Sequence, residues 1–333
     1  MSLMRAEIDE APAAVARVIA AMPAIAAVAA RIRALDPPFV TLAARGSSSH
    51  AGTFLRVLIG RDLGLTAAAS MPSLASVYHR PQRLGGTLFI TISQSGRSPD
   101  LIACATQARA SGALTLALVN DATSPLASAC ELVLDIQAGP ERSVAATKTV
   151  VATLATCIAL VRLWAGREPE LADLPARLAA APDWPRLVPT LVTTAHIFTV
   201  GRGPALGIAK ELALKLAETC GIAGLAFSAA ELAHGPMALA GIGFPVLAVL
   251  QQDAALPHSE ALLASIAARE TEVFAAGGMV AGGIVLPVLA PSDPDADLLV
   301  MLVSAYRAIE AAARARGLDP DRPRALQKIT RTF

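Results

Sequence analysis

Short apolar runs alternate with longer helical segments along most of this chain. The first helical segment is rich in alanine and covers residues 5–35, with interruptions expected at Pro12 and Pro23. The apolar runs have the length of buried strands, and in the first half of the chain they cover residues 39–44, 88–93, 113–119 and 132–136. Buried strands that alternate with helices predict an α/β fold, in which helices cover both faces of a parallel sheet.

The same succession of elements occurs a second time. Residues 39–44 precede a glycine turn and a helical stretch that ends at Gly64, and residues 196–200 precede a similar turn and stretch that end near Gly221. The two glycines stand 157 positions apart. Two later matches pair residues 88–93 with 244–250 and residues 113–119 with 279–286. A repeat of this length predicts two doubly wound parallel-sheet domains in tandem.

Prolines mark the expected domain boundaries. Asp36-Pro37-Pro38 ends the N-terminal helical region, and five prolines between residues 168 and 189 indicate a linker. The expected organisation is a helical segment over residues 1–36, a first domain over 37–168, a second domain over 190–318 and a C-terminal tail over 319–333.

The composition narrows the classes of function. A formal net charge of +1 gives no electrostatic basis for binding nucleic acid or an anionic membrane. The most apolar stretch, residues 150–164, contains polar residues and is shorter than the roughly 20 residues of a membrane span, so a buried helix is expected. The N-terminus is charged where a signal peptide is apolar, and the four cysteines lie in apolar stretches without metal-ligand spacing. We therefore expect a cytoplasmic protein with reduced, buried thiols.

The strongest local motif lies between a predicted strand and a predicted helix. Residues 93–100 (SQSGRSPD) stand where a helix N-terminus would offer backbone N–H groups and a partial positive charge to a phosphate. Gly96 allows a close approach of the backbone. Further donors come from Ser93, Gln94, Ser95 and Ser98. An ordinary serine cap needs one hydroxyl only, so the motif predicts phosphate binding, and it differs from the glycine-rich loops that bind nucleotides.

Two other polar segments follow predicted strands. Residues 46–49 (GSSS) stand after the first strand, and residues 141–148 (ERSVAATK) stand between a strand and a helix. Both are placed to touch a ligand at the carboxyl edge of the sheet. Each is also consistent with a solvated turn, or with a helix start at which Thr147 and Lys148 are solvated.

Candidate acid–base residues lie in the second domain. Glu211, Lys215 and Glu218 share one helix face, where a partly buried carboxylate beside a lysine can move a proton between adjacent sugar carbons. A solvated ion-paired stripe is the alternative. His234 precedes a Gly-Pro pair and either titrates in a pocket or is hydrogen-bonded at a helix end. Lys328 lies in a basic tail that is either solvated or covers an anionic substrate. No second His or Cys stands at zinc-ligand spacing, and we expect no metal or cofactor.

These motifs together resemble a known family. They are Ser93-Gln94-Ser95-Gly96, Ala145-Ala146-Thr147-Lys148, Ala213-Leu214-Lys215-Leu216 with Glu218, Glu231-Leu232 with His234-Gly235-Pro236, and Asp321, Pro323-Arg324, Leu326 and Lys328 in the tail. In this order they are similar to the double sugar-isomerase (SIS) domain family. In particular they resemble the isomerase half of glutamine–fructose-6-phosphate aminotransferase and the stand-alone SIS-type glucosamine-6-phosphate deaminases. The resemblance extends from Glu7-Ile8 and Glu10 to the end of the chain.

The resemblance implies roles for matching residues. Ser48, Ser93, Gln94, Ser95 and Ser98 match phosphate binders, and Ser47, Glu141, Val144 and Ala146 match residues at the sugar. Glu218 matches the base that moves a proton between C1 and C2, with Lys215 beside it. His234 matches a ring-opening histidine that comes from the other subunit of a homodimer. Lys328 matches a tail lysine that contacts the open-chain sugar.

The departures from the synthase point to a deaminase. Arg45-Gly46-Ser47-Ser48 replaces a Cys-Gly-Thr-Ser pattern, Ala146 replaces a serine, and the chain begins at the isomerase unit. We therefore expect a phosphosugar aldose–ketose isomerase that deaminates glucosamine 6-phosphate to fructose 6-phosphate and ammonia. The alternatives are a glutaminase-lacking synthase-like enzyme, a fructosamine-6-phosphate deglycase and a sugar-phosphate sensor without catalysis.

Overall fold

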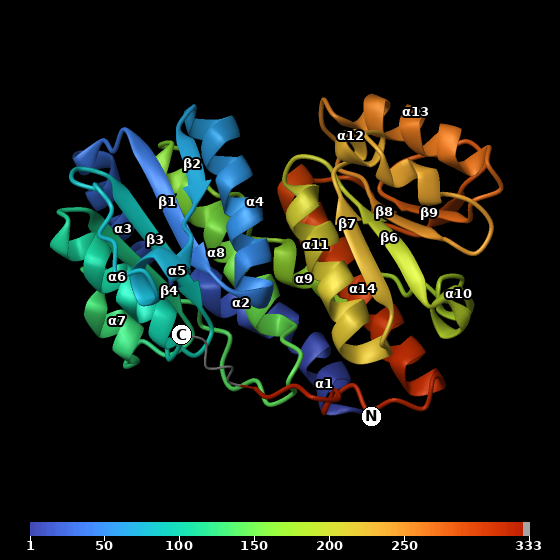
Figure 1. Ribbon diagram of the computed structural model, residues 1–333, viewed down its shortest axis with the longest axis horizontal. Helices are drawn as coiled ribbons and strands as arrows, with labels where there is room; N and C mark the ends of the chain where they lie inside the picture. Colours follow the sequence, from blue (N-terminus) through green and yellow to red (C-terminus); the bar gives the residue numbers. More distant parts are fainter. Residues whose placement is uncertain (329–333) are drawn as a thin grey trace. The chain divides into compact units, whose positions relative to one another are not determined.

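Two parallel five-stranded sheets form the framework of the computed structural model, which describes residues 1–328 (Figure 1). The strand orders are β2-β1-β3-β4-β5 and β10-β9-β8-β6-β7, and all of the paired strands are parallel. The predicted α/β fold with two doubly wound sheets is confirmed. The strands are β1 (Phe39–Ala44), β2 (Thr66–Ala69), β3 (Leu88–Ser93), β4 (Leu114–Val119), β5 (Leu132–Asp135), β6 (His196–Val200), β7 (Ala223–Phe227), β8 (Val246–Val249), β9 (Val273–Ala276) and β10 (Ile284–Leu286).

The contacts between residues divide the chain into two compact units that do not follow its linear order. The first-sheet unit contains residues 13–141 and 148–172 together with Gln327 and Lys328. The second-sheet unit contains residues 1–12, 142–147 and 173–326. The N-terminal residues and the short segment before Lys148 therefore belong with the second sheet, although they lie next to first-sheet elements in the sequence.

Helices cover both faces of the first sheet. Leu42 of β1 faces helix α4 (Gly46–Leu63), which packs with α8 (Lys148–Trp164), and α8 packs with α3 (Met22–Leu35). The neighbouring Ala43 points to the opposite face, where α5 (Pro72–Ser76) and α6 (Pro99–Ala110) pack. Helix α7 (Pro125–Ala129) packs with α6. All but one residue of α8 are buried, which confirms the buried helix predicted for residues 150–164.

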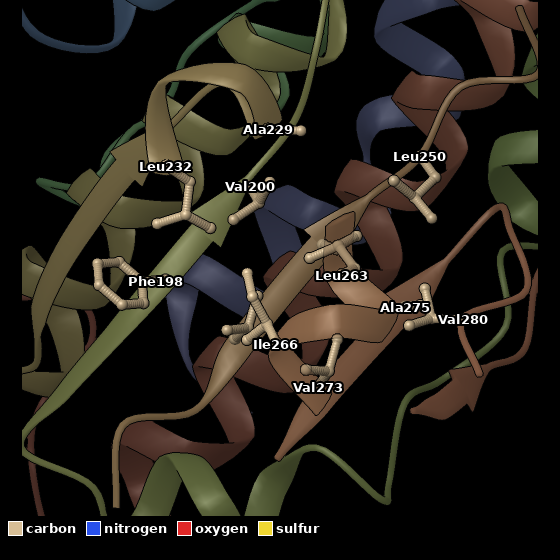
Figure 2. Packing of buried hydrophobic residues seen from close by; sticks show 12 residues of the cluster. Phe198, Val200, Ala229, Leu232, Leu250, Leu263, Ile266, Val273, Ala275 and Val280 are labelled. Atoms are coloured by element: carbon tan, nitrogen blue, oxygen red, sulfur yellow. The ribbon is translucent and has the colours of Figure 1, made fainter. Parts of the chain in front are cut away.

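The second sheet is covered in the same way. Helix α11 (Ala205–Lys215) packs on β6 and β7 and continues as a π-helical turn, Leu216–Cys220, and both contact α14 (Pro294–Ala315). On the other face, Leu232 of α12 (Ala229–Leu232) and Ile266 of α13 (Leu256–Ala267) pack against Phe198 and Val273 of the strands (Figure 2). Three further helices, α1 (Leu3–Asp9), α9 (Leu174–Ala179) and α10 (Val188–Thr193), pack on α14.

The internal repeat is confirmed, but one predicted strand match is wrong. β4 occupies the fourth place in the first sheet, and its counterpart in the second sheet is β9. Residues 279–286, which were matched with β4, instead include β10 at the sheet edge. The apolar run of β9 is only four residues long (VFAA), because three polar residues, Glu270, Thr271 and Glu272, stand directly before it. The longer apolar run that follows β9 therefore resembles β4 more closely in sequence.

Prolines begin helices here more often than they end them. Pro12 lies at the second position of α2 (Ala11–Ala20), and Pro23 lies at the second position of α3, so the breaks fall just before these residues rather than at them. A proline fits the first helical turn because its missing N–H would have no helical partner there. Within residues 1–328 no single helix is long and apolar enough to cross a membrane, although the pair α2 and α3, bent by 59°, meets that test on length and composition.

Candidate functional site

The loop after β3 gathers the hydroxyl groups of three serines. Ser93 Oγ accepts a hydrogen bond from the Gly96 N–H at 3.2 Å, and Ser95 Oγ accepts one from the Arg97 N–H at 3.3 Å. A hydroxyl that accepts in this way keeps its own hydrogen for another partner. Ser98 is the N-cap residue of α6, and its hydroxyl makes no capping bond within the described chain. The loop therefore brings three hydroxyl groups to one helix N-terminus.

The position of Gly96 permits no larger residue. Its φ is +61°, and a Cβ there would lie 2.1 Å from Ser124 Oγ. Two backbone bonds hold the loop against the next strand and helix: the Asn120 N–H donates to the Gln94 carbonyl, and the Leu126 N–H donates to the Gly96 carbonyl, both at 3.1 Å. The loop is thus fixed before any ligand binds.

The predicted polar turn after β1 is instead the first turn of α4. Ser47 and Ser48 lie in this turn and are half-buried. Arg45 Nε lies 2.9 Å from Oδ2 of Asp100, whose side chain is fully buried in the first turn of α6. This ion pair ties the start of α4 to the start of α6, so that two helix N-termini face the same sheet edge.

Glu141 is the centre of a polar network in the first-sheet unit. Its Oε2 accepts a hydrogen bond from Gln94 Nε2 at 2.6 Å, and its Oε1 accepts one from the Thr149 N–H at 3.3 Å. Gln94 Nε2 also donates to Thr149 Oγ1 at 3.1 Å. Lys328 Nζ lies 3.6 Å from Glu141 Oε2, which brings the predicted tail lysine to the residue predicted to contact sugar. Thr147 and Lys148 are buried, so the alternative of a helix start at which they are solvated is wrong.

A second charged group lies inside the second-sheet unit. Lys215 Nζ donates to Glu218 Oε2 and lies 3.4 Å from Glu211 Oε1. Tyr306 donates its hydroxyl hydrogen to Glu211 Oε1 at 2.9 Å. The side chains of Lys215 and Glu211 are 0% and 1% exposed, which rules out the solvated stripe, whereas Glu218 is 19% exposed and is the carboxylate that a ligand can reach.

The electrostatics keep Lys215 charged. Burial alone would lower the pKa of Lys215, but the attraction of Glu211 and Glu218 outweighs it and raises the pKa above the ordinary 10.5. Glu218 lies in the π-helical turn Leu216–Cys220, a geometry that is frequent at functional sites. In that turn Thr219 Oγ1 donates to the Lys215 carbonyl at 2.7 Å. A carboxylate beside a permanent ammonium suits proton transfer at a reacting carbon.

The remaining predicted site residues lie in two separate loops of the second-sheet unit. His234 is exposed and follows α12, and Gly235 after it has a φ of +125°. Val144 and Ala146 are half-buried in the segment of residues 142–147. His234 therefore lies on an exposed turn.

A cavity of about 210 Å³ opens elsewhere in the second-sheet unit. It is lined mainly by apolar side chains, among them Leu250, Leu286 and Met301, with Arg177 and Asp297 at its polar side. The predicted site residues that the structure describes all lie outside its lining. Across residues 1–328, no group of three His, Cys, Asp or Glu side chains is arranged to hold a metal ion.

Several residues of these networks were missed from the sequence. Thr149 and Tyr306 are buried polar residues within apolar helices, and only the fold shows which carboxylate each contacts. Glu7 was noted within a motif but had no assigned role, although it is buried and bonds to the segment that carries Val144. Polar residues inside an apolar helix were the available signal for the first two.

The comparisons with known proteins agree with this fold and these motifs. A model of the SIS domain matches residues 39–163 and 190–275, and this chain belongs to the SIS domain family. The resemblance inferred from the motifs is thereby confirmed.

Solved structures and curated relatives resemble this chain over most of its length. A protein from Silicibacter pomeroyi DSS-3 that is assigned as a phosphosugar isomerase is 42% identical, with a TM-score of 0.92 over 96% of this chain and 100% of that one. The C-terminal domain of glucosamine-fructose-6-phosphate aminotransferase from Francisella tularensis shares the fold, with a TM-score of 0.85 and 24% identity over 97% and 98% of the two chains.

Glutamine–fructose-6-phosphate aminotransferase from Symbiobacterium thermophilum is 31% identical over 334 residues, which cover 90% of this chain and 52% of that protein. The chain thus spans about half the length of the curated relatives that it matches.

Proposed function

We propose that this protein is a phosphosugar aldose–ketose isomerase that converts glucosamine 6-phosphate to fructose 6-phosphate and ammonia. The observation that carries the proposal is the triad at Lys215, in which Glu218 is held beside a buried ammonium and keeps a 19% exposed edge. A base of this kind can take a proton from a carbon next to a carbonyl. Membership of the SIS family and the likeness to the Silicibacter protein support the isomerase class.

The proposed reaction has three chemical steps. His234 first moves a proton between the ring oxygen and the C1 hydroxyl, which opens the ring. Glu218 then takes the C2 proton, the C–H electron pair forms a C1–C2 double bond, and the π pair of the C1 carbonyl moves onto its oxygen, which takes a proton from water. Return of the first proton to C1, with the nitrogen lone pair forming the C2–N double bond, gives the protonated C2 imine of the ketose and leaves C1 as CH₂OH. Water adds to this imine, and cleavage of the C–N bond releases ammonia and leaves fructose 6-phosphate.

The first-sheet unit supplies binding groups in this proposal. The serine loop offers the hydroxyl hydrogens of Ser93, Ser95 and Ser98 to the phosphate at the N-terminus of α6. Lys328, beside Glu141, contacts the open-chain sugar. The family resemblance supports both assignments, and it also supports a homodimer in which His234 acts on the substrate of the other subunit. The exposure of His234 is compatible with that role.

The reverse direction is the second candidate, and the curated relatives favour it because they are named aminotransferases. In that direction ammonia would attack C2 of fructose 6-phosphate, and Glu218 would return a proton from C1 to C2. The same carboxylate serves both directions.

Ammonia release and proton exchange at C2 test the proposal together. The purified chain is incubated with glucosamine 6-phosphate in D₂O. Ammonia is measured by a coupled assay, and NMR measures the replacement of the C2 proton by deuterium. We expect one ammonia for each fructose 6-phosphate formed. In Glu218→Gln we expect the rate of ammonia release to fall by roughly 10²–10⁴-fold. Glu231→Gln removes an exposed carboxylate of α12 and is the matched control, with activity as in the wild type.

The outcomes separate the candidates. Formation of glucosamine 6-phosphate from fructose 6-phosphate and ammonium, without appreciable reverse reaction, would favour the synthase direction over deamination. Exchange that is equal in the wild type and in Glu218→Gln would refute the role of Glu218. Binding of phosphosugars without exchange would favour a sensor.

A further inference from the structure

The N-terminal helix α1 holds the segment of residues 142–147 through one buried carboxylate. Glu7 is 5% exposed and accepts hydrogen bonds from the backbone N–H groups of Arg142 and Ser143 and from the Ser143 hydroxyl. The Ser143 N–H lies 3.2 Å from one Glu7 oxygen and 3.3 Å from the other. The Ser143 hydroxyl is also 3.1 Å from the Ala145 carbonyl. The backbone just before Val144 is therefore fixed by Glu7.

The tail is tied to the same place. The Asp321 carboxylate accepts hydrogen bonds from the N–H groups of Leu3 and Met4, at 2.8 and 2.7 Å, where α1 begins. The Asp321 carbonyl accepts a hydrogen bond from the Val144 N–H at 3.2 Å. One hydrogen-bonded network thus joins helix α1, the segment of residues 142–147 and the start of the tail. Asp321, the tail residue in this network, stands seven residues before Lys328 in the sequence.

This arrangement orients a loop more strictly than apolar packing would. A buried carboxylate is costly unless its oxygens are hydrogen-bonded, and here both oxygens accept from the loop. Bonds to an ionised acceptor are stronger and more directional than bonds between neutral groups. Displacement of a substrate-positioning group by about 1 Å can lower a rate 10²-fold, so the orientation of such a loop bears directly on catalysis.

We propose that Glu7 is a positioning residue for the sugar. It fixes residues 142–147 so that Val144 and Ala146 present one defined surface to the substrate. The inference rests on the function proposed above, because Val144 and Ala146 are assigned to the sugar there. Glu7 acts through the loop and does not touch the reacting atoms. Its loss is therefore expected to weaken recognition of the sugar and to leave recognition of the phosphate unchanged.

Steady-state kinetics with glucosamine 6-phosphate and inorganic phosphate test this separation. We expect Glu7→Ala to raise KM by about 10–100-fold. The inhibition constant of inorganic phosphate stays at the wild-type value, because residues 93–98 are held by bonds within the first-sheet unit. Glu7→Gln keeps an acceptor oxygen but loses the charge, so its KM lies between those of the wild type and Glu7→Ala. Glu10→Gln, an exposed site directly after α1, is the matched control and behaves as the wild type.

A purely structural role gives a different result. A smaller folded fraction lowers kcat and leaves both KM and the phosphate constant unchanged, and that pattern in Glu7→Ala and Glu7→Gln would overturn the proposal. An equal rise of KM and of the phosphate constant would also overturn it, since the effect would then not be confined to the sugar.

Hydrogen–deuterium exchange separates this inference from the proposed function. We expect the amides of residues 143–146 to exchange at least about tenfold faster in Glu7→Gln than in the wild type, because a charged acceptor is lost. Faster exchange in a protein that turns over no phosphosugar would refute the proposed function while the hold of Glu7 on the loop stands. Unchanged exchange together with an unchanged KM would refute the inference, whatever the activity of the wild type.

Discussion

Replacement of Lys215 by methionine tests whether the buried triad is electrostatically coupled. Methionine replaces the apolar stem of the lysine but lacks its terminal ammonium, and it leaves Glu211 and Glu218 without their shared cation. Loss of one partner of a buried ion pair costs about 3–5 kcal/mol. Tyr306 still donates to Glu211, and the 19% exposed edge of Glu218 can reach water, so we expect the lower end, about 3 kcal/mol.

Urea unfolding measures this loss, provided that the signal comes from the correct unit. Trp184 is buried in the second-sheet unit with Lys215, whereas Trp164 belongs to the first-sheet unit, so a Trp164→Phe background makes fluorescence report the relevant one. Lys210→Met, on the same helix but partly exposed, is the control and should lose no more than about 1 kcal/mol. A loss below about 1 kcal/mol in Lys215→Met would refute the reasoning, because it would mean that water screens the triad.

The difference in unfolding free energy between the wild type and Lys215→Met should depend on pH, and this dependence checks the sign of the interaction. The folded state raises the pKa of Lys215, so it binds this proton more tightly than the unfolded chain does. The resulting stability is complete below the ordinary value of 10.5 and is lost as pH rises through the higher folded value. The gap between the wild type and Lys215→Met should therefore be flat from about pH 6 to pH 9 and narrow only above about 10.5. A gap that narrows between pH 6 and 9 would contradict this account.

Two further predictions concern the phosphate loop and the thiols. Gly96→Ala should raise the inhibition constant of inorganic phosphate at least about tenfold, because the added Cβ meets Ser124 at 2.1 Å and φ is +61°. An unchanged constant would show that the loop is not the phosphate site. Burial raises the pKa of every cysteine thiol to about 11 or about 12, so a thiol reagent at pH 8 should label four groups only after denaturation, and rapid labelling of the native protein would contradict this. These residues are Cys104, Cys130, Cys157 and Cys220.

Much of the fold could be predicted because its signals are local. β1 and β6 begin and end at the predicted residues, and Gly64 and Gly221 both adopt the left-handed conformation that ends a helix, with φ of +68° and +64°. The strand match failed where the second copy has a short strand, β9, behind polar residues. The register of a short parallel strand is set by its neighbours in the sheet, which no local pattern reveals.

The candidate site was predictable only where its residues stand together in the sequence. The serine loop after β3 and the spacing of Lys215 and Glu218 were local signals. The hydrogen bond between Ser143 and Glu7 joins positions more than 130 residues apart, and the one between Leu3 and Asp321 joins positions more than 300 residues apart. Both form because the second-sheet unit is built from segments that are not consecutive in the sequence. Burial separates a reactive carboxylate from a solvated one, and it follows from the packing of the whole unit.

A comparison of the two domains shows which residues occupy the positions of Glu211 and Lys215 in the other copy of the repeat. A shift of 157 positions superimposes the helix that ends at Gly64 on the one that ends at Gly221, and it places Glu211 and Lys215 where α4 has Phe54 and Leu58. All four side chains are at most 1% exposed, so the positions are equally buried in both copies. Apolar residues of similar volume at a buried ion pair are often neutral or stabilising, so stability alone does not account for the charges in the second copy. Departures from apolar packing of this kind are expected at functional sites. The comparison of the two halves therefore supports a chemical role for the second-domain helix independently of the family resemblance.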